Sequence, residues 1–272
     1  MRLQIRHVTT YAYDKPLRHV AMSHRLVPAS FEGQNVERWD VTCEGAIFGD
    51  GFVDGAGDLV RTMTVQGPVD RVEVRVDGVV DTADSAGVLR GHREMISPLV
   101  YTRSTAATSP TRALRELRDA ALRSATEPDV LSRAHSMCDA VADAIEYEAG
   151  ATDASTSAAE ALERGKGVCQ DHAHALIALA HAADLPARYV TGSLLARDDG
   201  AAEDASHAWA EIHVEGLGWV GFDPANRCCP DARYVRLGSG RDALDAAPIR
   251  GVSRGGGVEA LDVTVEVSSA QQ

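Results

Sequence analysis

Lysine is scarce in this sequence, and so are long apolar runs. Only Lys15 and Lys166 are lysines among 27 basic residues, which face 40 acidic residues and give a net charge of −13. Such a charge argues against nucleic acid or an anionic membrane as the main partner. The sequence has no stretch of roughly 18 apolar residues to span a membrane, and its first segment, MRLQIRHVTTYAY, lacks the apolar stretch of roughly 7–15 residues of a secretion signal. We therefore expect a cytoplasmic protein.

Cysteines are few and unevenly spaced, and they form no Cys-x-x-Cys pair. The five positions are Cys43, Cys138, Cys169, Cys228 and Cys229. An odd, irregular set excludes a disulfide framework, and it offers no resolving partner for a redox thiol. Paired zinc-ligand motifs and Asp-rich calcium loops are also missing, so we expect no metal and no cofactor.

The chain is long enough for two domains, and 44% of its 272 residues are hydrophobic. Residues 1–83 alternate apolar with polar side chains, most regularly in RVEVRVDGVV at 71–80, which predicts an antiparallel β domain. Residues 84–110 lack a clear period and are interpreted as a linker that packs on both parts.

Residues 111–272 are predicted to form a core in which helices precede strands. The helices are expected over 113–123, 130–147 and 168–183, with a short helix after Ser157, and the strands over 188–195, 207–215, 219–223 and 261–267. This order indicates the α+β class, with helices packed on an antiparallel sheet.

Cys169 follows the break Gly165-Lys166-Gly167 and lies in the first turn of a predicted helix. A helix N-terminus presents free N–H groups and partial positive charge, which favours a thiolate and can stabilise an oxyanion. A buried structural cysteine is the alternative reading of this segment alone.

His207 and Asp223 are predicted to face each other across a hairpin. In the segment 207–214 the odd positions are His, Trp, Glu and His, whereas the even positions are apolar. The three-residue loop 216–218 pairs odd with odd positions, so both side chains share one face, about two cross-strand pairs apart. A carboxylate beside an imidazole orients it in a nucleophile–base–orienter triad. A half-buried histidine and a turn aspartate before Pro224 are the alternatives.

Three segments carry a family resemblance. GVCQDHAHALIALAHAADLPARYVTG, HAWAEIHVEGLGWVGFDPAN and GRDALDAAPIRG resemble the core of bacterial transglutaminase-like proteins of the papain-like cysteine superfamily, and the segment around HVTTYAY is similar to the β domain before that core. The resemblance implies a papain-like transglutaminase core behind an N-terminal β domain.

The resemblance also implies roles for three residues: Cys169 as nucleophile, His207 as general base and acid, and Asp223 as orienting carboxylate. It implies acyl transfer on a peptide or isopeptide bond through a thioester. We expect hydrolysis, without calcium, ahead of cross-linking. A transamidase and a decayed, non-catalytic peptide-binding module remain alternatives.

Departures from the family pattern are local. Ala225 stands where threonine is usual, and His172 where an aromatic residue is usual. The indole found upstream of the nucleophile in animal transglutaminases is missing, with Tyr147 and Gln170 as weak substitutes for that oxyanion donor. The acidic segment 198–204 is interpreted as a solvated loop. The N-terminal domain is a candidate surface for self-association into a homo-oligomer.

Overall fold

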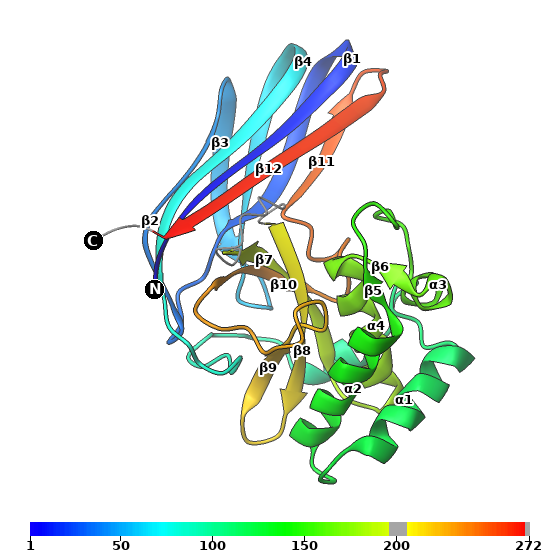
Figure 1. The fold of residues 1–272 in the computed structure, drawn as a ribbon. Coiled ribbons are helices and arrows are strands. Elements are labelled where there is room, and N and C mark those ends of the chain that lie inside the picture. The colour runs from blue at the N-terminus through cyan, green and yellow to red at the C-terminus, as the bar shows by residue number, and fades with distance from the viewer. Residues whose placement is uncertain (196–205, 270–272) are drawn as a thin grey trace.

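The computed structural model describes residues 1–195 and 206–269 and has the predicted α+β class (Figure 1). Antiparallel strands precede and follow a group of helices. No helix in these two ranges is long and apolar enough to cross a membrane.

The first sheet has six strands and stands above the rest of the molecule in Figure 1. Its strands are β1 (Arg2–Val27), β2 (Gln34–Cys43), β3 (Ala46–Val53), β4 (Leu59–Thr82), β11 (Ile249–Arg254) and β12 (Glu259–Ser269). The strand order is β11-β1-β4-β2, with β12 also paired to β1 and β3 to β4.

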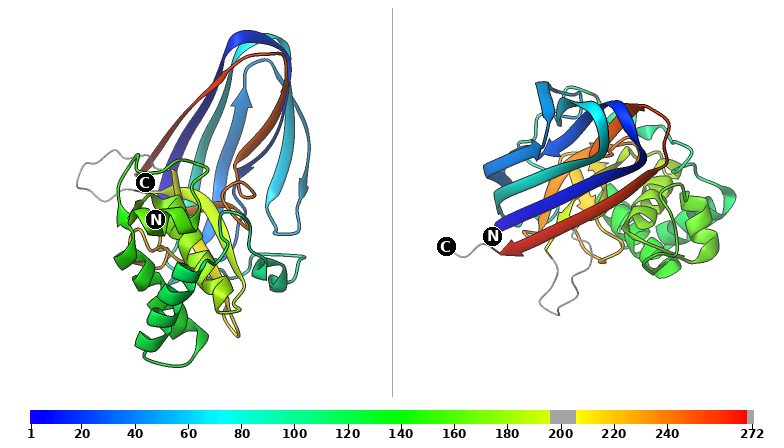
Figure 2. Two further views of the ribbon diagram at one scale, coloured as in Figure 1. Left: turned by 90° about the vertical axis from the view of Figure 1, so that its right-hand side faces the viewer. Right: turned by 90° about the horizontal axis from the view of Figure 1, so that it is seen from above.

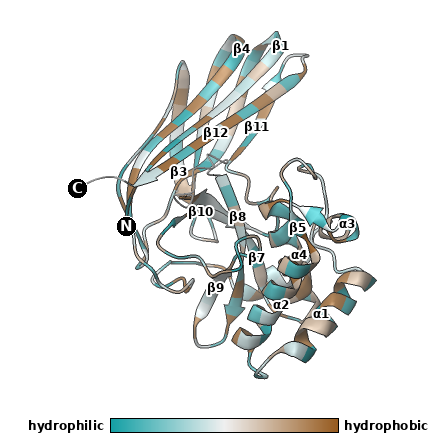
Figure 3. Ribbon diagram, viewed as in Figure 1, coloured by the Kyte–Doolittle hydropathy of each residue, from teal (hydrophilic) through white to brown (hydrophobic). Residues whose placement is uncertain are grey.

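The two longest strands, β1 and β4, bend where their register shifts between Ala12 and Leu17. Beyond the bend each strand turns back, so its two halves lie in two layers (Figure 2). Alternation of apolar and polar residues along the strands, visible in Figure 3, places one face of each layer inside. The buried residues between the layers include Leu17, Val20, Met22, Met63, Val65, Val72, Val74 and Val76.

The second sheet has four antiparallel strands in the order β10-β7-β8-β9. They are β7 (Ala187–Leu194), β8 (Ser206–Val214), β9 (Gly218–Phe222) and β10 (Tyr234–Gly240). The sequence analysis did not predict β10. One face of this sheet is covered by helices, and the other by the segment 84–110 and the adjoining end of the first sheet.

The helices are η1 (Pro98–Thr102), α1 (Arg112–Ser124), α2 (Val130–Ala144), α3 (Ala158–Arg164) and α4 (Cys169–Ala182). Helix α4 lies against β7 and β8 and is surrounded by α1, α2 and α3 (Figure 1). It is buried along nearly its whole length, because its small alanines allow close approach of the sheet and of the neighbouring helices.

The entry to α4 is fixed by short-range interactions. Ser157 and Glu160 form a reciprocal capping box at the start of α3. Gly165 ends α3 with φ of 66°, a left-handed conformation that favours glycine. The short strands β5 (Glu146–Tyr147) and β6 (Lys166–Gly167) then pair in parallel and set the direction in which α4 begins.

Residues 84–110 contact both parts of the molecule. Leu89 N–H donates to the Trp219 carbonyl at 2.9 Å in the second sheet, and Met95 N–H donates to the Gly55 carbonyl at 3.0 Å beside the first sheet. Glu94 also accepts from Arg188 Nη1 at 2.6 Å.

The end of the chain differs from the predicted division, which placed all of 111–272 in the core. Strands β11 and β12 return to the first sheet and pair with the two halves of β1. The physical reason is that β1 would otherwise leave one row of N–H and C=O groups without partners.

Candidate active site

Cys169 is the first residue of α4, and its side chain is half-buried. Its own N–H lies in the first turn and has no partner within the helix. The turn is held by Asp171, which accepts from Val168 N–H at 2.8 Å and from Thr152 Oγ1 at 2.5 Å. The local fold therefore presents a thiol together with a backbone donor that can reach a substrate oxygen.

His207 and Asp223 meet as the hairpin register predicts. Glu211 lies opposite Gly221 and His213 opposite Trp219, so odd positions pair with odd positions. His207 Nε2 lies 2.6 Å from Asp223 Oδ2. The Cys169 thiol is a second hydrogen-bond partner of the imidazole. Because Nε2 faces the carboxylate, Nδ1 is the ring nitrogen left for the thiol.

The charges and hydrogen bonds around His207 favour the protonated form of its imidazole. Burial by itself lowers the pKa of His207, but the hydrogen bonds to Asp223 and Cys169, with their charges, outweigh it and raise the pKa to about 10. Burial likewise raises the pKa of Asp223, and the hydrogen bond and charge of His207 outweigh it, so the net direction is downward. The pair is therefore an ionised carboxylate against an imidazolium at neutral pH.

Two further residues hold the Asp223 carboxylate. Asn226 Nδ2 donates to Oδ2 at 2.8 Å, and Asn226 N–H donates to Oδ1 at 3.2 Å. The hydroxyl of Tyr234 donates to Oδ2 at 2.8 Å. The substitution at Ala225 leaves these contacts intact. The sequence analysis missed Tyr234, although the alternation in YVRLG at 234–238 was a signal for its strand.

Trp209 packs beside the imidazole on the same face of β8. Its ring is stacked with His207 at 6.3 Å between centroids and 26° between planes, and it contacts Tyr234 edge-on at 5.5 Å. The even positions of β8, Ala208, Ala210 and Ile212, are buried in the helix-facing core. The prediction that the even positions of β8 form an apolar face and the odd positions a second face with polar side chains is confirmed.

His172 lies near Cys169 in sequence but is occupied elsewhere. Its Nδ1 lies 2.9 Å from the Val168 carbonyl oxygen, and its Nε2 lies 2.9 Å from the Ile145 carbonyl oxygen. Neither nitrogen is free to accept a thiol proton. His174 Nε2 accepts from Ala243 N–H at 3.0 Å, so this neighbour also has a structural contact.

The other four cysteines are poorly placed for nucleophilic chemistry. Burial raises the pKa of the Cys43, Cys138 and Cys228 thiols, and it raises the pKa of Cys229 to about 11. Raised values keep sulfur in the unreactive thiol form. Cys169 is thus distinguished by its place at a helix start beside an imidazole.

The remaining predicted features are placed as follows. Tyr147 lies in β5 with its ring 6.3 Å from that of His172, and Gln170 Nε2 donates to the Ala154 carbonyl at 3.5 Å. The acidic segment 198–204 falls outside the described residues. In the described ranges no three or more His, Cys, Asp or Glu side chains gather as metal ligands, and metal independence stays a prediction.

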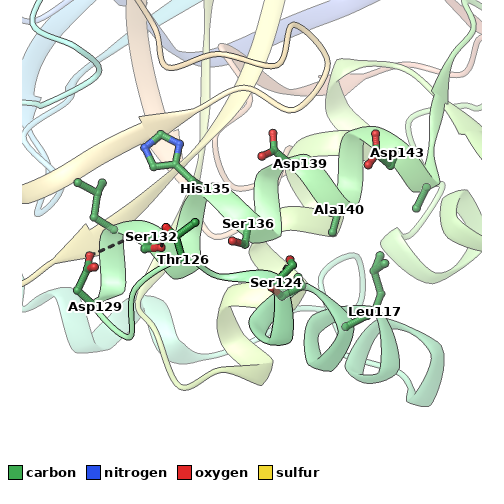
Figure 4. Close-up of a pocket in the computed structure, with 14 residues that line it drawn as sticks. Leu117, Ser124, Thr126, Asp129, Ser132, His135, Ser136, Asp139, Ala140 and Asp143 are labelled. Carbon is green, nitrogen blue, oxygen red and sulfur yellow. Dashed lines mark hydrogen bonds between the residues drawn. The ribbon is translucent and has the colours of Figure 1, made fainter.

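A cavity of about 910 Å³ lies elsewhere, between α1 and α2 (Figure 4). It is lined by residues of these helices and their connection, including Leu117, His135, Asp139 and Ala140. None of the three predicted catalytic residues lines it, so the site described above is not this cavity.

Comparison with known families agrees with the geometry. Residues 117–224 match the transglutaminase-like superfamily, and residues 3–81 match the bacterial transglutaminase-like N-terminal region. Residues 117–224 are a transglutaminase-like core. The matched core contains all three predicted catalytic residues, and this match supports cysteine-based catalysis in general.

Relatives of this transglutaminase-like chain occur in mycobacteria. It is 29% identical to an uncharacterized protein of Mycobacterium leprae over 98% of both chains. It is 37% identical to an uncharacterized protein of Mycobacterium tuberculosis over 44% of this chain and 42% of that protein.

A crystal structure at 1.9 Å has the same fold. It is of a protein from Cytophaga hutchinsonii that is provisionally described as a cysteine protease, with a TM-score of 0.74 and 22% identity over 100% of this chain and 91% of that one. This likeness confirms the predicted architecture of an N-terminal β domain before a transglutaminase-like core.

Proposed function

We propose that this protein catalyses cysteine-dependent acyl transfer on peptide or isopeptide amide bonds, with hydrolysis as the main outcome. The observation that carries the proposal is the continuous set of contacts from the Cys169 thiol through His207 to the buried Asp223 carboxylate. A nucleophile, a base and an orienting group in this arrangement form the set of groups required for covalent acyl transfer.

The first half-reaction forms a thioester. His207 carries the proton of the Cys169 thiol as an imidazolium, and the thiolate sulfur attacks the amide carbonyl carbon. The Cys169 N–H donates to the oxyanion of the tetrahedral intermediate. The C–N bond then breaks, and His207 gives its proton to the departing amine. Asp223 holds the imidazole orientation and its positive charge through both steps.

The second half-reaction releases the acyl group. His207 takes a proton from a water molecule, whose oxygen attacks the thioester carbon. The C–S bond breaks, a carboxylic acid leaves, and the Cys169 thiolate and the His207 imidazolium are restored. If an amine takes the place of water, the same steps give a new amide, which is transamidation. The triad supports both outcomes equally.

Access to the thioester decides between water and amine. A cross-linking enzyme benefits from an apolar channel that excludes water. Aromatic residues make up only 5% of this chain, and the indole that lies upstream of the nucleophile in animal transglutaminases is missing. The sequence therefore offers little to build such a channel, so we favour hydrolysis.

A peptide library incubated with excess tagged amine and EDTA tests the proposal. Mass spectrometry reports cleavage and amine incorporation in one run. We expect hydrolysed products to outnumber amine adducts, and we expect no product with Cys169→Ala. A majority of amine adducts would make the protein a transamidase, and activity that needs added calcium would contradict calcium independence.

A non-catalytic peptide-binding module is the second candidate. The intact set of Cys169, His207 and Asp223 favours the enzyme. A thiol-reactive peptide analogue separates the two, because an enzyme should attach it covalently to Cys169 while a binding module should release it unchanged. Cytoplasmic location and self-association through the first sheet stay predictions.

A further inference from the structure

Tyr234 is a member of the site that lies outside the predicted triad. Its hydroxyl donates to Asp223 Oδ2 at 2.8 Å, the same oxygen that lies 2.6 Å from His207 Nε2. The side chain comes from β10, on the opposite side of β7 from β8, and the residue is only 5% exposed.

The Asp223 carboxylate needs such a donor because it is fully buried. A buried carboxylate stays ionised only when hydrogen bonds and charges replace its hydration. Burial and the Asp223 charge raise the pKa of the Tyr234 phenol. The phenol therefore keeps its proton and always donates it to the carboxylate.

The ring of Tyr234 is held in place by its neighbours. It meets Trp209 edge-on at 5.5 Å and His207 at 5.9 Å with 62° between the planes. Removing only the hydroxyl would leave these ring contacts unchanged. The hydroxyl can thus be tested separately from the packing.

Cys228 completes a second layer of contacts. Its Sγ lies 3.3 Å from the Tyr234 hydroxyl oxygen. Since the phenol proton goes to Asp223, the thiol is the donor in this contact. Backbone hydrogen bonds in both directions also join Cys228 to Asp223, at 2.8 and 3.2 Å. The loop that follows β9 is therefore closed directly beside the carboxylate.

We propose that Tyr234 is a positioning residue: its hydroxyl fixes the charge and orientation of Asp223, which holds His207 toward Cys169, and Cys228 orients that hydroxyl. This inference rests on the proposed function. Besides Cys169, the titratable groups near the His207–Asp223 pair are Tyr234 of β10, Cys138 of α2 and Cys228.

The test compares Tyr234→Phe with the wild-type protein in two measurements. The first is the protonation midpoint of the His207 ring, followed by nitrogen NMR. It should fall in the variant, because the carboxylate is no longer held against Nε2 by the phenol and so stabilises the imidazolium less. The second is the rate profile against pH. We expect kcat to fall roughly tenfold or more, from the loss of one hydrogen bond to a charged group. KM should change little, and the alkaline limb should move to lower pH.

Substitutions at Cys228 provide a second test, with a smaller expected change in the His207 midpoint. Cys228→Ala should lower the His207 midpoint in the same direction but by less, whereas Cys228→Ser keeps a donor and should stay near wild type. Tyr11→Phe, in the first sheet, is the matched control and should change neither measurement. If Tyr234→Phe does not fold, the Cys228 pair tests the same contact.

The outcomes separate this inference from the proposed function. An unchanged protonation midpoint of His207 in Tyr234→Phe overturns the positioning role. If Tyr234→Phe does not fold, an unchanged midpoint in Cys228→Ala does the same. An unchanged kcat of Tyr234→Phe in an active protein also overturns it. A lowered midpoint in a protein that turns over no amide supports the positioning role and refutes the proposed function.

Discussion

Arg236 of the second sheet donates to Asp58 beside the first sheet, with Nη1 and Oδ1 3.1 Å apart and both side chains buried. The same guanidinium donates to Glu211 through Nε at 3.0 Å, and Glu211 accepts from Arg188 at 2.6 Å. Asp58 also accepts from Ser239 N–H at 2.7 Å. These contacts join the β domain to the core through buried charges.

Asp58→Asn should destabilise the protein strongly, because it leaves Arg236 with a buried charge and one partner fewer. The expected loss in the free energy of unfolding is about 3–5 kcal/mol. Urea unfolding measures it. Glu37→Gln, which breaks an exposed ion pair with Arg2, is the control and should cost much less. Equal losses in both variants would mean that the two domains are joined by other contacts.

The same network predicts acid sensitivity. Burial raises the pKa of Glu211, but Arg236 and Arg188 outweigh it and hold the value at about 2. The folded state therefore binds this proton more weakly than the unfolded state does. The resulting stability is present above the ordinary glutamate range and is lost as pH falls toward 2.

Glu211→Gln removes that titration. Urea unfolding measured from neutral to acidic pH should show a shallower loss of stability in the variant than in the wild type, on top of a lower stability at neutral pH. Parallel curves would show that Glu211 does not carry the effect.

Cys169 should be alkylated ahead of the other four cysteines. Iodoacetamide at about pH 6 reacts with thiolates, and burial raises the pKa of the other four thiols. Peptide mass spectrometry after partial labelling of the native protein gives the order. Labelling of Cys43 or Cys138 at an equal rate would refute the assignment of Cys169.

His207→Ala should abolish turnover, and His172→Phe should keep most of it per folded molecule. The imidazole of His207 contacts both Cys169 and Asp223, whereas His172 is engaged with two backbone carbonyls. Steady-state rates corrected for the folded fraction make the comparison. The reverse ranking would place the base on α4.

Much of the candidate site could be predicted because its determinants are local. The alternation after His207 and the three-residue loop fix a hairpin register, and a period of two leaves only one face for each side chain. The glycine-flanked break before Cys169 likewise marks a helix start. These patterns depend on residues a few positions apart, so they can be read directly from the chain.

The tertiary structure decided the parts that depend on long-range contacts. Tyr234 reaches Asp223 only because β10 pairs with β7 across the sheet. Asp58 meets Arg236 only because the two sheets are packed together. Strands β11 and β12 pair with β1 from the far end of the sequence. The pattern of apolar and polar residues within a strand does not specify which distant strand edge or charged side chain it will contact. That partner is determined by which sheet faces are buried together and which strand edges pair.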